Sequence, residues 1–179
     1  MPKKVLVLSS SPRRKGNSEL LCDQFIKGAR EAGHQVEKVN LKDKKINYCK
    51  GCGTCVDKPG TCTQKDNMAE ILAGMIEADV IVMATPVYFY TMCGQMKTLI
   101  DRTCSGYTQI SNKEFYFIVA AADTNVKAMQ RTIEEFRGFT YCLENPKEKG
   151  IVYGTGAWKT GEIKGSKAIH QAFEMGSRV

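Results

Sequence analysis

Strand-like and helix-like segments alternate along the whole of this 179-residue chain, and this alternation limits its possible folds more than any other feature. Apolar runs predict strands over residues 4–8, 80–84, 115–121 and 151–153, and such runs are typical of strands buried on both faces. Residues 35–41 mix polar and apolar side chains, as an edge strand does. Five strands with helices between them predict a parallel sheet that is covered by helices on both faces.

The segments between the strands carry apolar residues at helical spacing. They predict helices over residues 17–32, 68–76, 92–103, 129–136 and 164–175. Asn67 and Glu70 form a capping-box pattern at the start of the second helix, and Gly33 marks the end of the first. With right-handed crossovers, the economical arrangement is an α/β three-layer sandwich with strand order 2-1-3-4-5, formed by residues 1–179 as a single domain.

In a sheet of this order, ligands bind beside the carboxyl ends of the strands, at the switch point between the first and third strands. The first loop at that point, residues 9–18, is rich in hydroxyl groups and runs into a helix start, where backbone N–H groups favour an anion. Its spacing is neither a Walker loop nor a Gly-x-Gly-x-x-Gly fingerprint. Phosphate binding here would use the side chains of Ser9, Ser11, Arg13, Asn17 and Ser18. The alternative is a polar turn in which Asn17 only caps the helix.

The second loop at the switch point follows the third strand and gathers aromatic residues. It begins with Thr85, Pro86, Val87, Tyr88 and Phe89, and Tyr90 comes next. A proline and three aromatic rings therefore lie where a planar ligand would bind. Core packing and a contact between subunits are the alternatives, and the loop by itself does not decide between them.

Both loops resemble the NAD(P)H-dependent FMN reductase and iron–sulfur flavoprotein group. The first is similar to the group's Gly-Ser-Pro-Arg…Gly-Asn-Thr signature through residues 10–13 and 16–18, with Ser10 replacing a glycine and Ser18 replacing a threonine. Residues 85–102 are similar to the group's Pro-Val-Tyr…Lys…Asp-Arg segment. The resemblance covers nearly the whole chain.

The resemblance implies a flavodoxin-like fold that binds FMN, with the phosphate at residues 9–18 and the isoalloxazine ring at residues 85–89. It implies that Ala122 and Asp123, after the fourth strand, lie beside the ring, although many reductases of this fold have glycines there. It also implies NAD(P)H as the electron donor and a homodimer or homotetramer with flavins near the subunit interfaces.

Eight cysteines are many for a chain that lacks the pattern of a secretory signal and is therefore expected in the cytoplasm. Four are scattered and are predicted to be structural, as small buried hydrophobic residues: Cys22, Cys93, Cys104 and Cys142. The other four crowd into the irregular segment 42–66, as Cys49-x-x-Cys52-x-x-Cys55 followed by Cys62. In a reducing compartment such a cluster indicates metal or redox chemistry before structural disulfides.

Three interpretations of this cysteine-rich segment stay open. Four thiolates so close together suit an Fe–S cluster or a tetrahedral zinc ion, and the Cys-x-x-Cys-x-x-Cys run is more typical of Fe–S. A thiol–disulfide pair, such as Cys49 with Cys52, is the third interpretation. The pattern is similar to the motif by which iron–sulfur flavoproteins hold a [4Fe–4S] cluster, and this implies Cys49, Cys52, Cys55 and Cys62 as its ligands.

The formal net charge of +7 does not indicate a nucleic acid or membrane partner, because the lysines are dispersed and no helix has a basic face interleaved with aromatics. Neither histidine, His34 or His170, belongs to a nucleophilic triad pattern. The sequence favours an FMN-dependent oxidoreductase that passes electrons to a quinone, a flavin, dioxygen or a protein. A flavodoxin-type electron carrier and a zinc-stabilised interaction module are the alternatives.

Overall fold

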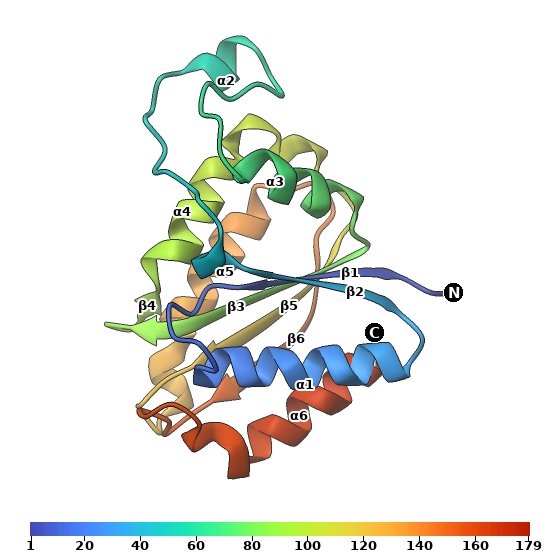
Figure 1. Cartoon of the computed structure of the whole chain (residues 1–179), viewed down its shortest axis with the longest axis vertical. Helices are drawn as coiled ribbons and strands as arrows, with labels where there is room; N and C mark the ends of the chain where they lie inside the picture. The colour runs from blue at the N-terminus through green and yellow to red at the C-terminus, as the bar shows by residue number, and fades with distance from the viewer.

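The computed structural model describes residues 1–179 and has one sheet, in which five parallel strands follow the order β2-β1-β3-β5-β6 (Figure 1). These strands are β1 (Lys4–Ser9), β2 (Gln35–Asn40), β3 (Val80–Tyr88), β5 (Glu114–Ala120) and β6 (Lys147–Gly154). Counted along the chain this is the order 2-1-3-4-5, so the predicted parallel sheet is confirmed. A sixth strand, β4 (Thr91–Met92), pairs antiparallel with the end of β3, and the sequence pattern does not predict it.

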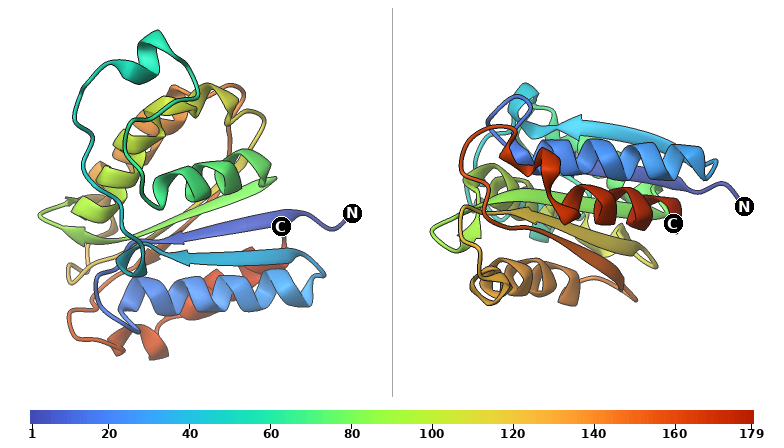
Figure 2. Two further views of the ribbon diagram at one scale, coloured as in Figure 1. Left: turned by 45° about the horizontal axis from the view of Figure 1, so that its top comes forward. Right: turned by 90° about the horizontal axis from the view of Figure 1, so that it is seen from below.

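Helices cover both faces of the sheet, which confirms the three-layer prediction. One face carries α1 (Asn17–Glu31) and α6 (Lys167–Ser177) side by side, and the other carries α3 (Met68–Glu77), α4 (Gly94–Arg102) and α5 (Gln130–Tyr141) (Figures 1 and 2). In β1, Val5 and Val7 pack toward α1, whereas Leu6 and Leu8 pack toward α3 and α4. None of the helices combines the length and the apolar character that crossing a membrane requires.

The chain after Ala84 forms a β-hairpin, where the sequence predicts a loop. β3 continues to Tyr88, and β4 pairs with it across a tight turn. Phe89 and Tyr90 make that turn with φ angles of 51° and 63°. Positive φ at both central residues gives a two-residue hairpin a twist that matches the right-handed twist of its strands.

The start of α3 is at the predicted place, but its cap differs from the prediction. Asn67 Oδ1 accepts the N–H of Lys45 at 2.8 Å, and Glu70 pairs with a second lysine, Lys44, at 3.1 Å. The first N–H of α3 instead donates to Asp66 Oδ1 at 3.2 Å. The predicted capping box is wrong because both of its polar side chains bind the segment that precedes the helix.

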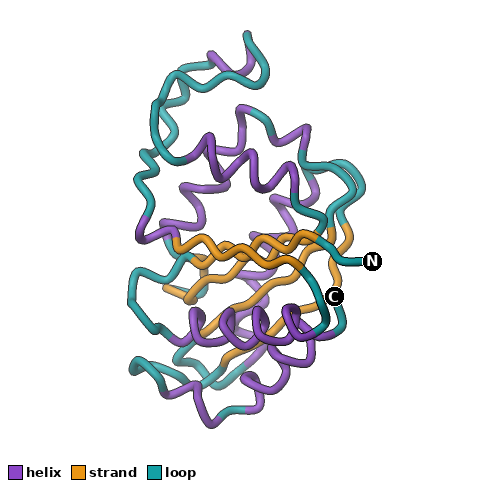
Figure 3. The backbone as a smooth tube through the Cα atoms, turned by 45° about the vertical axis from the view of Figure 1, so that its right-hand side comes forward, coloured by secondary structure: helices purple, strands orange, loops and turns teal.

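Between β2 and α3 the chain leaves the sheet and projects from the body of the protein (Figures 1 and 3). We call residues 44–66 the cysteine arm. It follows one turn, η1 (Leu41–Asp43), and contains a single short helix, α2 (Thr54–Asp57). The predicted irregular segment 42–66, with all four clustered cysteines, lies almost wholly within this arm.

Helices α1 and α6 approach each other through glycines. A Cβ atom on Gly176 would lie 2.0 Å from the carbonyl oxygen of Phe25, and one on Gly28 would lie 2.1 Å from that of Phe173. Both separations are far below van der Waals contact, so only glycine permits the two backbones to lie this close. The contact joins α1, which begins at the end of the loop 9–18, to α6, the last helix of the chain.

Gly176→Ala should lower the free energy of unfolding by about 1–3 kcal/mol, because the new methyl group must push α6 away from α1. Gly138→Ala in α5 is the matched control, since no atom lies within 4 Å of its Cβ position. That substitution should raise the free energy of unfolding by about 0.4–1 kcal/mol. Chemical denaturation measures both values. If both substitutions changed the free energy of unfolding in the same direction, the close approach of α1 and α6 at Gly176 would be contradicted.

Candidate functional site

The two loops selected from the sequence meet at the carboxyl edge of the sheet. With the end of β5 and the chain after β6 they enclose a cavity of about 110 Å³, which we call the edge cavity. Its lining consists of Ser11, Arg13, Gly16, Asn17, Ser18, Pro86, Val87, Tyr88, Ala120, Ala121, Ala122, Ala157 and Trp158. Eight of the predicted FMN-binding residues are among them.

Four predicted binding residues lie outside this lining. Ser9 and Thr85 are buried, and Ser9 shares the α1-facing side of β1 with Val7 because side chains alternate along a strand. Phe89 is 98% exposed at the tip of the hairpin. Asp123 accepts the N–H of Asn125 at 2.8 Å and stabilises its own loop.

Ser18 brings an unsatisfied polar group to the edge cavity. The residue is 1% exposed, and its hydroxyl oxygen has no hydrogen-bond partner in the protein. It is the second residue of α1, where the first N–H groups of a helix also lack intrahelical acceptors. Because buried polar side chains are nearly always bonded, this hydroxyl is available to a polar ligand at the start of α1.

Arg13 is the only charged residue that lines the edge cavity. Its Nη1 donates to the carbonyl oxygen of Trp158 at 3.0 Å, which keeps the guanidinium at the cavity wall. No carboxylate is present in the lining. The cation and the positive end of α1 therefore both favour an anionic ligand, as a phosphate group is.

The side chain of Asn17 is fully engaged with the loop 157–163. Its Nδ2 donates to the carbonyl oxygens of Ala157 at 3.1 Å and Lys159 at 2.9 Å, and its Oδ1 accepts the N–H of Gly161 at 3.0 Å. Asn17 thus positions the wall that carries Trp158, and its amide is not free to donate to a ligand.

The remaining wall of the edge cavity is apolar and suits a planar ring. Its lining here consists of Val87 and Tyr88 from the hairpin and of the small residues 120–122, which end β5 and follow it, and Trp158 of the same lining is 70% exposed. The family resemblance implies that Ala122 lies beside the ring. The sequence carries no signal for the other alanines, because small apolar residues at strand ends look like ordinary core.

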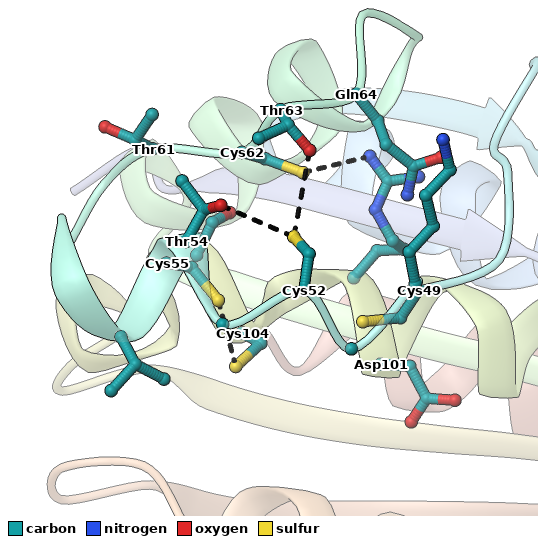
Figure 4. Close-up of a pocket in the computed structure, with 16 residues that line it drawn as sticks. Cys49, Cys52, Thr54, Cys55, Thr61, Cys62, Thr63, Gln64, Asp101 and Cys104 are labelled. Carbon is teal, nitrogen blue, oxygen red and sulfur yellow. Dashed lines mark hydrogen bonds between the residues drawn. The ribbon is translucent and has the colours of Figure 1, made fainter.

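A second cavity, of about 210 Å³, lies between the cysteine arm and the end of α4, and we call it the cysteine cavity (Figure 4). Five cysteines line it: Cys49, Cys52, Cys55 and Cys62 from the arm, and Cys104 from the turn η2 (Thr103–Ser105). The structure therefore brings the four clustered cysteines together and adds a fifth.

Two of the scattered cysteines depart from the prediction. Cys22 and Cys93 are buried, as predicted, and burial raises the pKa of the Cys22 thiol to about 12. Cys104 and Cys142 are exposed, so the prediction that both are buried structural residues is wrong. Each lies at the C-terminal end of a helix, where its thiol reaches the surface.

The thiols of the cysteine cavity face one space but do not converge on one point. Cys55 Sγ lies 3.6 Å from Cys104 Sγ, and Cys52 Sγ lies 3.5 Å from the hydroxyl of Thr54. No group of three or more His, Cys, Asp or Glu side chains is arranged to hold a metal ion. The donor set fits an Fe–S or zinc centre by its number and chemistry, and coordination requires the arm to close around the metal.

Hydrogen bonds to the hydroxyl and the N–H of Thr54, and to the hydroxyl of Thr63, lower the pKa of the Cys52 thiol to about 7. The lowered pKa raises the share of Cys52 that is ionised near neutral pH. The thiolate is the form that ligates a metal, so Cys52 is prepared for coordination.

Arg102, the last residue of α4, holds the cysteine arm at both of its ends. Nη1 donates to the carbonyl oxygen of Asn47 at 2.6 Å and to Asp66 Oδ2 at 2.8 Å, and Nη2 donates to Asp66 Oδ1 at 3.0 Å. Nη2 also lies 3.6 Å from Cys62 Sγ. The Arg102 and Asp66 side chains are 2% and 0% exposed, and the guanidinium holds the pKa of Asp66 well below its usual range.

A profile of the family described as NADPH-dependent FMN reductase matches residues 3–140. An iron–sulfur flavoprotein of Archaeoglobus fulgidus is 30% identical over 194 positions, which cover 98% of this chain and 93% of that protein. A second iron–sulfur flavoprotein of the same organism is 44% identical over 99 residues, which are 55% of this chain and 44% of that protein. The matched part of this chain thus spans less than half of the second relative's length.

Among solved structures, the NAD(P)H:quinone oxidoreductase from Methanothermobacter marburgensis matches with a TM-score of 0.76 and 16% sequence identity. The match covers 99% of this chain and 97% of that one. At this identity the likeness concerns the fold alone, and it confirms the flavodoxin-like architecture.

Asp66→Asn should lower the free energy of unfolding at pH 7 by about 3–5 kcal/mol, because it leaves the buried guanidinium of Arg102 unpaired. The folded-state pKa of Asp66 is depressed. The stabilisation is therefore present above the unfolded-state pKa of about 3.9 and is lost as the pH falls through the folded-state pKa. Chemical denaturation at pH 7 and at lower pH measures the free energy of unfolding of both proteins. The difference between the variant and the unsubstituted protein should become smaller as the pH falls.

The matched control for this variant is Glu70→Gln, which removes an exposed pair with Lys44. It should change the free energy of unfolding by less than about 1 kcal/mol. If Asp66→Asn lowered the free energy of unfolding no more than this control, Arg102 would not be the residue that anchors the arm.

Proposed function

The chain belongs to the NADPH-dependent FMN reductase family, and on that premise we propose that it is an FMN-dependent oxidoreductase that takes electrons from NAD(P)H. The unpartnered hydroxyl of Ser18 carries the proposal, because it lies at the start of α1 in a cavity whose only charged lining residue is Arg13. The phosphate of FMN is the kind of anion that such a helix start binds.

In this proposal the Ser18 hydroxyl, the first N–H groups of α1 and Arg13 bind the phosphate. Tyr88 and the alanines at the end of β5 lie against the ring, and Asn17 holds the wall that carries Trp158. Bound FMN supplies the redox chemistry, since it accepts a hydride and passes electrons on. The residues of this chain bind the cofactor, orient it and shield one side of it from water.

We propose a quinone, a free flavin, dioxygen or a protein as the electron acceptor. Phe89 and Trp158 are exposed near the edge cavity, at 98% and 70%, which supports contact with a planar acceptor or with a second subunit. Exposed aromatic residues at the hairpin tip also support assembly as a homodimer or homotetramer.

We further propose that Cys49, Cys52, Cys55 and Cys62 bind an Fe–S cluster. The Cys-x-x-Cys-x-x-Cys spacing, the shared cavity and the relatives named iron–sulfur flavoproteins support this. A bound cluster supplies one-electron transfer. Arg102 lies within hydrogen-bonding distance of Cys62 Sγ, and hydrogen bonds to ligand sulfur atoms are one factor that sets a cluster's potential.

The visible spectrum of protein purified without oxygen, with iron and zinc assayed on the same sample, tests both proposals. Flavin bands together with steady-state NAD(P)H oxidation would support the reductase. Flavin bands without NAD(P)H oxidation would indicate an electron carrier instead. A colourless protein that also fails to bind added FMN would contradict the central proposal, and zinc without iron would exclude the cluster.

Ser18→Ala should weaken FMN binding about 10-fold or more, because a hydrogen bond to a charged group contributes about 1.5–3 kcal/mol. The stability of the apoprotein should not fall, since this hydroxyl makes no hydrogen bond within the protein. Fluorescence titration of the apoprotein with FMN measures the affinity.

Ser166→Ala is the matched control for this variant. The Ser166 hydroxyl is also buried without a partner, but it precedes α6 and does not line the edge cavity. Its removal should leave the FMN affinity unchanged. An equal loss of FMN affinity in the two variants would contradict the proposal that the Ser18 hydroxyl binds the phosphate.

Cys52→Ala should abolish iron binding while FMN stays bound, because Cys52 lines only the cysteine cavity. Cys142→Ala removes an exposed thiol that is remote from the cysteine arm in the sequence, and it should retain the iron. Iron analysis and the flavin absorbance of the same preparations measure the two outcomes. Iron at the unsubstituted level in Cys52→Ala would exclude this residue as a ligand.

A further inference from the structure

The cysteine cavity contains one thiol more than a four-cysteine centre uses. Cys104 lies outside the Cys-x-x-Cys-x-x-Cys motif, on η2, and its Sγ is 3.6 Å from Cys55 Sγ (Figure 4). The two residues are 49 positions apart in the sequence, so the fold brings them together. Among the eight cysteines, this is the one pair whose thiols form a hydrogen bond with each other.

Contacts of the surrounding backbone hold the two thiols in this relation. The N–H of Gly60 donates to the carbonyl oxygen of Ser105, next to Cys104, at 2.7 Å. On the other side, the N–H of Val56 donates to the carbonyl oxygen of Gly53 at 2.8 Å and closes the turn that carries Cys55. The proximity of the thiols is therefore a property of the folded chain and does not require a metal.

Both thiols can be reached from solution. Cys104 is exposed and Cys55 is half-buried, whereas Cys22 and Cys93 are buried. Cys142 is exposed, but its thiol contacts only a backbone carbonyl oxygen of its own helix. Access combined with a second thiol within reach is the arrangement of cysteines that undergo reversible oxidation.

We propose that Cys55 and Cys104 form a reversible disulfide by exchange with a diffusible low-molecular-weight disulfide. The thiolate of the more exposed Cys104 attacks one sulfur atom of that disulfide, whose S–S bond breaks and releases one thiol. Cys55 then attacks the Cys104 sulfur, forms the intramolecular bond and releases the second thiol. The two protein thiols lose two electrons and two protons, and the diffusible disulfide gains them as it becomes two thiols.

Bond formation requires the two sulfur atoms to move from 3.6 Å to about 2.0 Å apart. The turn that carries Cys55 lies between Gly53 and Gly60, whose φ angles are 76° and 83°. None of the residues of α2 is buried. The turn can therefore shift toward η2 without disturbing either layer of the core.

The disulfide has a consequence for the metal centre, and this consequence rests on the proposed function. Cys55 is one of the four proposed cluster ligands, and a sulfur atom bonded to Cys104 is no longer available as a thiolate. The disulfide and the complete four-cysteine centre therefore exclude each other. Cys104 thus makes assembly of the centre depend on the thiol–disulfide balance around the protein.

Peptide mapping tests the bond directly. Metal-free protein is reduced, freed of reductant, incubated with oxidised glutathione and digested with trypsin without reduction. The Lys58–Pro59 bond resists trypsin, so peptide 51–65 carries three cysteines, and Cys104 lies in peptide 103–113. The expected product is these two peptides joined, with tandem mass spectrometry locating the bond at Cys55 and dithiothreitol reversing it.

Cys104→Ser should abolish the joined peptides, and Cys142→Ser should leave them unchanged. Cys104 found only as a glutathione adduct, or joined to Cys52 or Cys62, would overturn the proposal. Binding of ferrous iron alone, without sulfide or added thiol, measures the consequence: oxidised protein should bind several-fold less iron than reduced protein, and Cys104→Ser should bind the same amount in both states. If the joined peptides form but reduced protein binds no iron, the proposed cluster fails while the disulfide stands.

Discussion

The parallel register of β1 between β2 and β3 is the constraint from which the edge cavity follows. Ser9 lies opposite Asn40 on one side and Ala84 on the other, so the three strands run together up to this level. The chain leaves β1 through α1 on one face of the sheet and reaches β3 through α3 on the other. The connections therefore part at this edge, and the crevice between them is where open α/β sheets bind ligands.

The cysteine arm has no comparable support from the sheet or the core. None of residues 44–65 is buried, and an irregular segment of this length in a compact domain usually serves a function. One buried guanidinium replaces hydrophobic packing here, because Arg102 binds Asn47 and Asp66 at the two ends of the arm. The thiols between these two anchors stay accessible, which a segment packed into the core would not permit.

The strands, their order and the position of the edge cavity follow from the sequence, because apolar runs and the switch-point rule depend on local pattern and connectivity. The β3–β4 hairpin does not, since Phe89 and Tyr90 adopt positive φ without the Asn-Gly signal that marks such turns. The contacts of Asn17 and Cys104 also cannot be predicted from the sequence, because their partners lie 140 and 49 positions away along the chain. A side chain satisfied by a distant residue looks, in the sequence, like a free donor or a buried hydrophobic residue.

One helix sets the separation of the two cavities. Cys93, immediately before α4, donates its S–H to the carbonyl oxygen of Ser10 in the loop 9–18 at 3.3 Å, and Arg102 ends the helix at the cysteine arm. The nine residues of α4 span about 14 Å at about 1.5 Å per residue. Both anchoring residues are buried, so a rigid element holds the edge cavity and the cysteine cavity apart. If FMN and a metal centre bind as proposed, α4 contributes to the distance that electrons cross between them within one chain.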